Sequence, residues 1–172
     1  MKSIDVDERF LVNVIGAPID ALSWSTALSL IQRWAEKRQS RYICICNVHS
    51  LVTARRNPAF AEVIREADLA TPDGSPVAWF IRHLSLMHQE RINGPDLMLK
   101  YCAEAANRKE SIYLYGGTQS TLDILERKLQ QRFPGLRIAG AFSPTLRPLT
   151  AGEDAAIVDA INASGASTVW VS

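Results

Sequence analysis

Asp73 is the first residue whose type and setting point to chemistry. It lies in the run Thr71-Pro72-Asp73-Gly74, a strong turn signal between a short apolar stretch and a predicted helix. A carboxylate presented at such a turn can act as a general base that takes a proton from an attacking hydroxyl. The structural alternative is a turn former or a helix N-cap, and the local sequence leaves both interpretations open.

Two further segments suggest contacts with phosphate. Arg91 carries a planar guanidinium that matches paired phosphate oxygens, with a solvated surface charge as the alternative. Gly116 and Gly117 lie between a predicted strand and a predicted helix, where the backbone can approach a phosphate and helix N–H groups are free. A tight turn without a ligand is the alternative there. The chain has neither G-x-G-x-x-G nor G-x-x-x-x-G-K, so it shows no dinucleotide or P-loop motif.

Other polar and sulfur side chains give weaker signals. Asn47 follows an apolar strand and could contact a ligand or simply cap the next helix. His49 lies in the same loop, where a structural or exposed role is favoured over a catalytic one, and it is the second candidate for a base. Cys44 and Cys46 lie two apart in that strand and are predicted to be reduced core residues. With three cysteines, three histidines and no Cys-x-x-Cys pair, the sequence predicts no metal site.

These residues need a scaffold, and the chain predicts one by alternating short apolar strands with amphipathic helices. Strands are expected at 11–15, 42–46, 68–70, 111–115, 136–141 and 168–171, and Gly16 and Pro18 are expected to end the first. Helices are expected between the later strands. This order predicts an α/β fold with a parallel sheet, helices on both faces and a single domain over residues 1–172. The candidate residues then lie just beyond strand ends, at the edge where such sheets bind ligands.

Composition and termini narrow the class of protein. The chain has 19 basic and 18 acidic residues and a net charge of +1, so no overall field attracts nucleic acid. It has no apolar run of about 18 residues, and residues 1–10 lack a signal-peptide pattern, which predicts a cytoplasmic protein. The chain ends at Ser172, at the C-terminal end of a predicted strand, and from this we expect a truncated chain.

Five segments, in the same order and at similar spacing, resemble the WecG/TagA/CpsF glycosyltransferases. The most specific are the Asp-Gly pair and the Glu-Arg-x-x-Gly-x-Asp run that follows it. The five segments are Asn47-Val48-His49, Ala67-Asp68-Leu69-x-x-Pro72-Asp73-Gly74, Glu90-Arg91-Ile92-x-Gly94-x-Asp96-Leu97, Tyr113-Leu114-x-Gly116-Gly117 and Arg132-Phe133-Pro134-Gly135-Leu136-x-Ile138-x-Gly140.

The resemblance implies a Rossmann-like fold and the transfer of a sugar, often N-acetylmannosamine, from a UDP donor to a polyprenyl-diphosphate-linked acceptor. It implies catalysis without a metal, with Asp73 as base and Asn47 and Arg91 at active-site positions. Gly94 and Asp96 belong to the same motif and are expected to bind substrate, as are Gly116 and Gly117. Two departures stand out. Ile45 replaces a threonine that is common in the family, and the family's Gly-x-Pro-x-Gln-Glu segment after the last strand is missing.

The sequence therefore predicts an inverting UDP-sugar-dependent glycosyltransferase of bacterial surface polysaccharide or teichoic acid synthesis. The expected partners are the UDP-sugar, the lipid-linked acceptor, the inner face of the membrane and a second copy of the chain, with no nucleic acid. No amphipathic membrane anchor is expected in this stretch. A non-catalytic nucleotide-binding or regulatory α/β module is the alternative.

Overall fold

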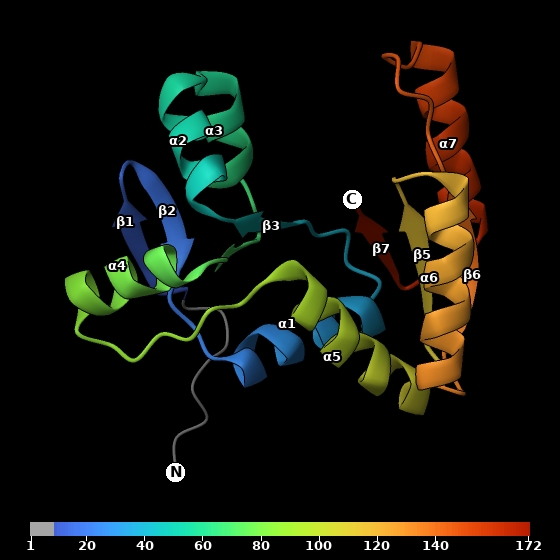
Figure 1. Ribbon diagram of the computed structural model, residues 1–172, viewed down its shortest axis with the longest axis horizontal. Coiled ribbons are helices and arrows are strands. Elements are labelled where there is room, and N and C mark those ends of the chain that lie inside the picture. The colour runs from blue at the N-terminus through green and yellow to red at the C-terminus, as the bar shows by residue number, and fades with distance from the viewer. Residues whose placement is uncertain (1–8) are drawn as a thin grey trace. The chain divides into compact units, whose positions relative to one another are not determined.

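A computed structural model describes residues 9–172 of the chain. The argument against a signal peptide rests on residues 1–10, and residues 1–8 of that segment lie outside the part of the chain that the structure describes. The elements in chain order are β1 (Leu11–Val14), β2 (Ala17–Asp20), α1 (Trp24–Glu36), β3 (Ile43–Cys46), α2 (Val48–Arg56), α3 (Pro58–Arg65), β4 (Leu69–Pro72), α4 (Ser75–Ser85), α5 (Gly94–Arg108), β5 (Ser111–Tyr115), α6 (Gln119–Arg132), β6 (Arg137–Phe142), α7 (Ala151–Ala163) and β7 (Thr168–Val171), as shown in Figure 1.

The chain divides into two compact units, Met1–Leu97 and Met98–Ser172. Each unit has parallel strands joined through helices, which confirms the predicted α/β class and agrees with a Rossmann-like arrangement. The single domain over residues 1–172 stays a prediction. No helix within residues 9–172 has the length and apolar character needed to cross a membrane.

The first unit opens with a hairpin that the sequence analysis missed. Gly16 and Pro18 were expected to end the first strand, and that expectation is wrong for Pro18, which lies inside β2. Strands β1 and β2 pair antiparallel, with Val14 opposite Ala17. The two residues between them, Ile15 and Gly16, have φ values of 49° and 101°, as the tightest hairpin turns require.

Strands β3 and β4 of the first unit pair in parallel, with Cys46 opposite Pro72. Apolar side chains of the hairpin, of the two parallel strands and of helices α2, α3 and α4 form one buried cluster. Its members are Val12, Val14, Ala17, Ile19, Ala21, Cys46, Leu51, Ala54, Ile64, Ala70, Val77 and Ile81. This cluster fixes the ends of β3 and β4, which carry the candidate residues.

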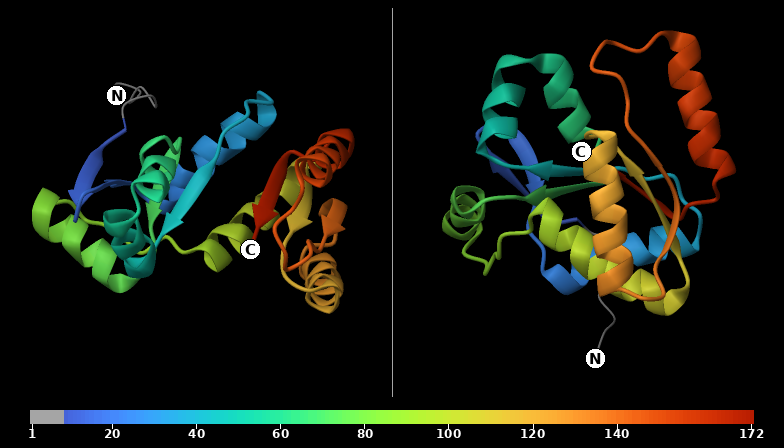
Figure 2. Two further views of the ribbon diagram at one scale, coloured as in Figure 1. Left: turned by 90° about the horizontal axis from the view of Figure 1, so that it is seen from above. Right: turned by 45° about the vertical axis from the view of Figure 1, so that its right-hand side comes forward.

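The second unit contains the parallel sheet β6-β5-β7. Gly140 of β6 lies against the Tyr113 ring, where a Cβ atom would come within 2.6 Å of a ring carbon. Helix α7 contributes to a cavity with Tyr113, whereas Tyr101 of α5 packs on Trp170, which pairs with Leu114. Successive side chains of a strand point to opposite faces, so α7 and α5 cover the two faces of this sheet, and Figure 2 shows the strands between them.

Candidate active site

Asn47 and Asp73 lie at the same edge of the first unit. Asn47 follows β3 and Asp73 follows β4, and these two parallel strands end in register. The backbone N–H of Asp73 donates to the carbonyl of Cys46 over 3.0 Å, which extends the pairing one residue beyond β4. The structure therefore brings together two of the residues that the sequence selected, at the carboxyl edge where ligands of α/β sheets bind.

The Asp73 carboxylate does not cap the helix that follows it. The N-cap of α4 is Gly74, whose φ of 93° suits glycine, and α4 has no side-chain cap. Among the described residues, the half-buried Asp73 carboxylate makes no hydrogen bond or ion pair. The N-cap alternative for Asp73 is thus wrong, because the turn is held by backbone bonds. The carboxylate remains free to exchange a proton with a ligand.

Asn47 does cap a helix, which confirms that part of its predicted behaviour. Its amide oxygen accepts from the backbone N–H of Ser50 at 3.0 Å and from the Ser50 hydroxyl at 3.2 Å. Its amide nitrogen donates to no group that the structure describes, and the residue is exposed. Asn47 can thus hold the start of α2 with one atom and offer a donor to a ligand with the other. His49 lies in the first turn of α2 and is exposed.

The segment 89–93 carries Arg91 to the other side of β4. On that side, the Ala70 N–H donates to the Asp20 carboxylate and the Pro72 carbonyl accepts from the Ile92 N–H over 2.9 Å. Arg91 precedes Ile92, so its backbone lies next to the end of β4. Its half-exposed side chain is therefore available to a ligand at the edge that carries Asp73.

Gln89 anchors this segment from within. Its side chain is 1% exposed, and its amide oxygen accepts from the Leu22 N–H at 2.8 Å. Its amide nitrogen donates to the Leu22 carbonyl at 2.9 Å and to the Glu90 carbonyl at 2.8 Å. The Arg82 guanidinium donates to the Gln89 carbonyl. The loop that carries Arg91 is therefore fastened at residues 89 and 92.

Gly94 and Asp96 lie at the start of α5, and their expected role in binding substrate stays a prediction. The Asp96 N–H donates to the Asn93 side-chain oxygen at 2.8 Å, and the Asn93 amide donates to the Asp96 carboxylate at 2.6 Å. The Arg91 guanidinium lies 3.8 Å from the same carboxylate. Asp96 is thus placed to orient Arg91. A Cβ atom on Gly94 would be in ordinary contact with Ile45, the residue found in place of the family's threonine.

Gly116 and Gly117 lie in the second unit, between β5 and α6. Gly116 has a φ of 117°, and a Cβ atom there would overlap the carbonyl oxygen of Ser172. Its N–H donates to the Phe142 carbonyl, and the Gly117 carbonyl accepts from the Ser143 hydroxyl. These contacts support the tight-turn interpretation, since close backbone packing requires glycine at position 116. A role of the pair in binding phosphate stays a prediction.

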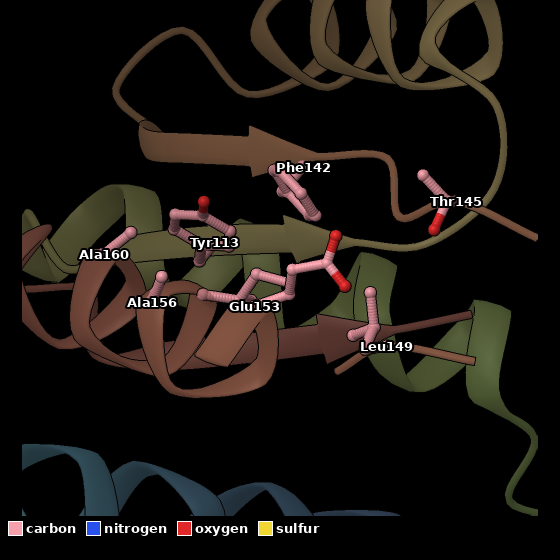
Figure 3. Close-up of a pocket in the computed structure, with 8 residues that line it drawn as sticks. Tyr113, Phe142, Thr145, Leu149, Glu153, Ala156 and Ala160 are labelled. Atoms are coloured by element: carbon pink, nitrogen blue, oxygen red, sulfur yellow. The ribbon is translucent and has the colours of Figure 1, made fainter. Parts of the chain in front are cut away.

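A cavity of about 310 Å³ opens between α7 and the sheet of the second unit (Figure 3). It is mainly apolar and is lined by Tyr113, Phe142, Thr145, Leu149, Glu153, Ala156, Ile157 and Ala160. Hydrogen bonds from Arg147, and then from the backbone and hydroxyl of Thr150, lower the pKa of Glu153 to about 2. Glu153, the one charged residue of the lining, is paired with Arg147, so the lining itself offers no positive charge to the diphosphate of a nucleotide sugar.

The sequence analysis missed two residues of the first unit's site, Asn93 and Gln89. Asn93 has the three-residue spacing of a capping pair with Asp96, and that signal was available in the sequence. Gln89 gave no signal, because its partner Leu22 is 67 residues away in the chain. Burial around the same edge raises the pKa of the Cys46 thiol to about 12, so Cys46 is a neutral core residue, as predicted. All three cysteines are free.

Comparison with known proteins identifies the family of the chain. The model of the glycosyl transferase WecG/TagA/CpsF family matches residues 12–172. A curated relative from Bacillus subtilis (strain 168), named N-acetylglucosaminyldiphosphoundecaprenol N-acetyl-beta-D-mannosaminyltransferase, is 23% identical over 111 residues. That match covers 64% of this chain and 43% of the relative, so the chain spans less than half of the relative's length. Because the family match extends over nearly the whole sequence, the chain belongs to the WecG/TagA/CpsF family of glycosyltransferases.

Proposed function

We propose that this protein transfers a sugar, N-acetylmannosamine-like or a hexose, from a UDP-sugar to a polyprenyl-diphosphate-linked acceptor at the cytoplasmic face of the membrane. The family match and the name of the relative support sugar transfer and a lipid-linked acceptor. The resemblance of the motifs supports the UDP donor. The product would enter a bacterial surface polysaccharide or teichoic acid.

One observation carries the assignment of the site. Asp73 presents a carboxylate with no partner among the described residues, while Asn47 lies on one side of it and the Arg91 segment on the other. A carboxylate that neither caps a helix nor pairs with a cation contributes little to folding. Its position at the carboxyl edge of two parallel strands suits a group that acts on a ligand.

The proposed reaction is a single displacement with inversion. The acceptor hydroxyl oxygen attacks the anomeric carbon, and its proton moves to the Asp73 carboxylate. The bond between the anomeric carbon and the diphosphate oxygen breaks, and UDP leaves with the electron pair. Arg91, oriented by Asp96, stabilises the negative charge that develops on the diphosphate. Asn47 donates from its amide nitrogen to the donor sugar or to the nucleotide.

The proposal makes the reaction independent of a metal ion, because Arg91 supplies the positive charge. Within residues 9–172 no group of three or more His, Cys, Asp and Glu side chains is arranged to hold a metal. The test is transfer in the presence of excess EDTA. Activity that falls with EDTA and returns with a divalent cation would refute this part of the mechanism.

The deciding experiment is Asp73→Asn in the complete gene product, assayed with a UDP-sugar and a polyprenyl-diphosphate-linked acceptor. Loss of the base should lower kcat about 10²- to 10⁴-fold. The melting temperature should not change, because the carboxylate holds neither the turn nor α4. UDP should still protect the variant, by about 2.7 kcal/mol at about 100 times its Kd. An unchanged kcat would remove Asp73 from the mechanism and make His49 the next candidate.

A further inference from the structure

Helix α4 carries large apolar side chains on its exposed side as well as on its buried side. Val77, Ala78 and Ile81 face the core of the first unit, and the first and last of these belong to its buried cluster. The exposed side of α4 and the residues after it form a second apolar surface. We call it the α4 apolar face; it consists of Trp79, Phe80, Leu84, Leu86 and Met87.

These five side chains are strongly exposed for their size. Trp79 is 52% exposed, Leu84 55% and Leu86 91%. Figure 1 shows α4 beside the β1–β2 hairpin at an outer edge of the first unit. Large exposed apolar patches mark interaction sites. Some partner is therefore expected to cover this face.

The composition of the face matches a membrane surface. Trp79 packs edge-on against Phe80 and stacks on His83 with ring centroids 5.2 Å apart in both pairs. Such amphipathic rings are favoured at the boundary between lipid headgroups and acyl chains. From residue 74 to residue 89 the chain has no acidic residue, and Arg82, which is exposed, adds a positive charge. An anionic lipid surface complements this set, since the nearest carboxylates along the chain, Asp73 and Glu90, lie outside it.

The α4 apolar face lies on the helix that directly follows the Asp73 turn. Helix α4 begins at Ser75, two residues after Asp73, and only Gly74 separates them. An interfacial helix buries its apolar side to about 5–10 Å, near the level of the headgroups. A helix docked in this way would keep the Asp73 turn close to the plane in which a lipid-linked diphosphate lies.

We infer that the α4 apolar face docks this protein on an anionic membrane and thereby presents the Asp73 edge to the lipid-linked acceptor. The second half of this statement rests on the proposed function. The first half does not, because docking needs neither nucleotide nor acceptor. The inference differs from the sequence-based expectation that the stretch carries no amphipathic anchor, and the experiment below decides between the two.

The test is flotation of the complete gene product with vesicles of equal parts phosphatidylglycerol and phosphatidylcholine, and with vesicles of phosphatidylcholine alone. The chain should bind the anionic vesicles, about fivefold more tightly per cation engaged than the neutral ones. Replacing Trp79 and Phe80 together by serine should weaken binding about tenfold or more. A matched control replaces Ile124 and Val158, which are equally exposed on α6 and α7, by serine and should bind like the parent.

A second variant, with Leu84 and Leu86 replaced by glutamine, keeps the test valid if the first fails to fold. Parent chain that stays unbound on anionic vesicles would overturn the inference, as would equal losses in the control. Self-association in sedimentation that the serine variant abolishes, without vesicle binding, would assign the face to a second copy instead. UDP protection without vesicle binding would refute docking alone, whereas vesicle binding without UDP protection or transfer would refute the proposed function alone.

Discussion

The side chain of Gln89 offers the sharpest test of how the site is built. Gln89→Leu nearly keeps the volume of the side chain and removes its three hydrogen bonds, to the Leu22 N–H, the Leu22 carbonyl and the Glu90 carbonyl. The two bonds to Leu22 hold the segment that carries Arg91 against the chain just before α1. The same change therefore perturbs both folding stability and donor binding.

The magnitude follows from which partners can reach water afterwards. Gln89 is 1% exposed, so the Leu22 N–H loses a buried acceptor, and such an orphaned donor costs about 1–3 kcal/mol. The Glu90 carbonyl belongs to an exposed residue and can bond to solvent. Each remaining bond contributes about 0.5–1.5 kcal/mol net, and the leucine recovers part of the loss by burying apolar atoms. We expect a net destabilisation of about 2–3 kcal/mol.

The assay measures the free energy of unfolding by urea denaturation, monitored by circular dichroism. UDP binding is measured separately on the folded variant. The matched control is Gln119→Leu, because the Gln119 amide donates to Asp123 on the exposed surface of α6. That control should lose no more than about 0.5 kcal/mol. If Gln89→Leu were no more destabilised than the control, the Gln89 side chain would not fasten the loop. If stability fell while UDP affinity held, Arg91 would not depend on this anchor.

Three further outcomes test other parts of the structure. Arg91→Lys keeps the charge but should raise KM for the UDP-sugar, since an ammonium lacks the bidentate fork; unchanged kinetics would make Arg91 a surface residue. Burial raises the pKa of Cys46 to about 12 and that of Cys102 to about 11. Both thiols should therefore resist thiol reagents at about pH 8 until the chain is unfolded. The pKa of Glu153 is lowered to about 2, so the ionised carboxylate stabilises the fold fully at pH values above the ordinary pKa of a glutamate. That stabilisation is lost as pH falls through about 2. Glu153→Gln should therefore lower the melting temperature at neutral pH but not near pH 2.

Local sequence signals predicted the elements well because they depend on neighbours along the chain. Ser23 and Ser25 both precede an apolar helical run in the sequence, and Ser23 is the one that accepts from the Thr26 N–H at the start of α1. The expected strand at 111–115 coincides with β5, and most other predicted bounds lie within two residues of those found. Periodicity and capping act over one or two turns, so they can be recognised without the fold.

The hairpin β1–β2 shows where local signals misled. Glycine followed by proline two residues later resembles the end of a strand. Pro18 is nevertheless tolerated inside β2, where it pairs opposite Asn13. That pairing depends on Ile15 and Gly16 both adopting positive φ, and for isoleucine only the completed hairpin stabilises such a conformation.

The sequence by itself determined the α/β class, the positions of the strand ends and the residue types at those ends, Asn47, Asp73 and Arg91 among them. Only the tertiary structure decided that β3 and β4 are neighbours in register and that Gly74, not Asp73, is the N-cap of α4. It also decided that Gln89 fastens the Arg91 segment to Leu22, which is 67 residues away from Gln89 in the chain. Strand pairing and buried hydrogen bonds join residues distant in the chain. Their partners are selected by the packing of the whole unit and leave no periodic mark in the sequence.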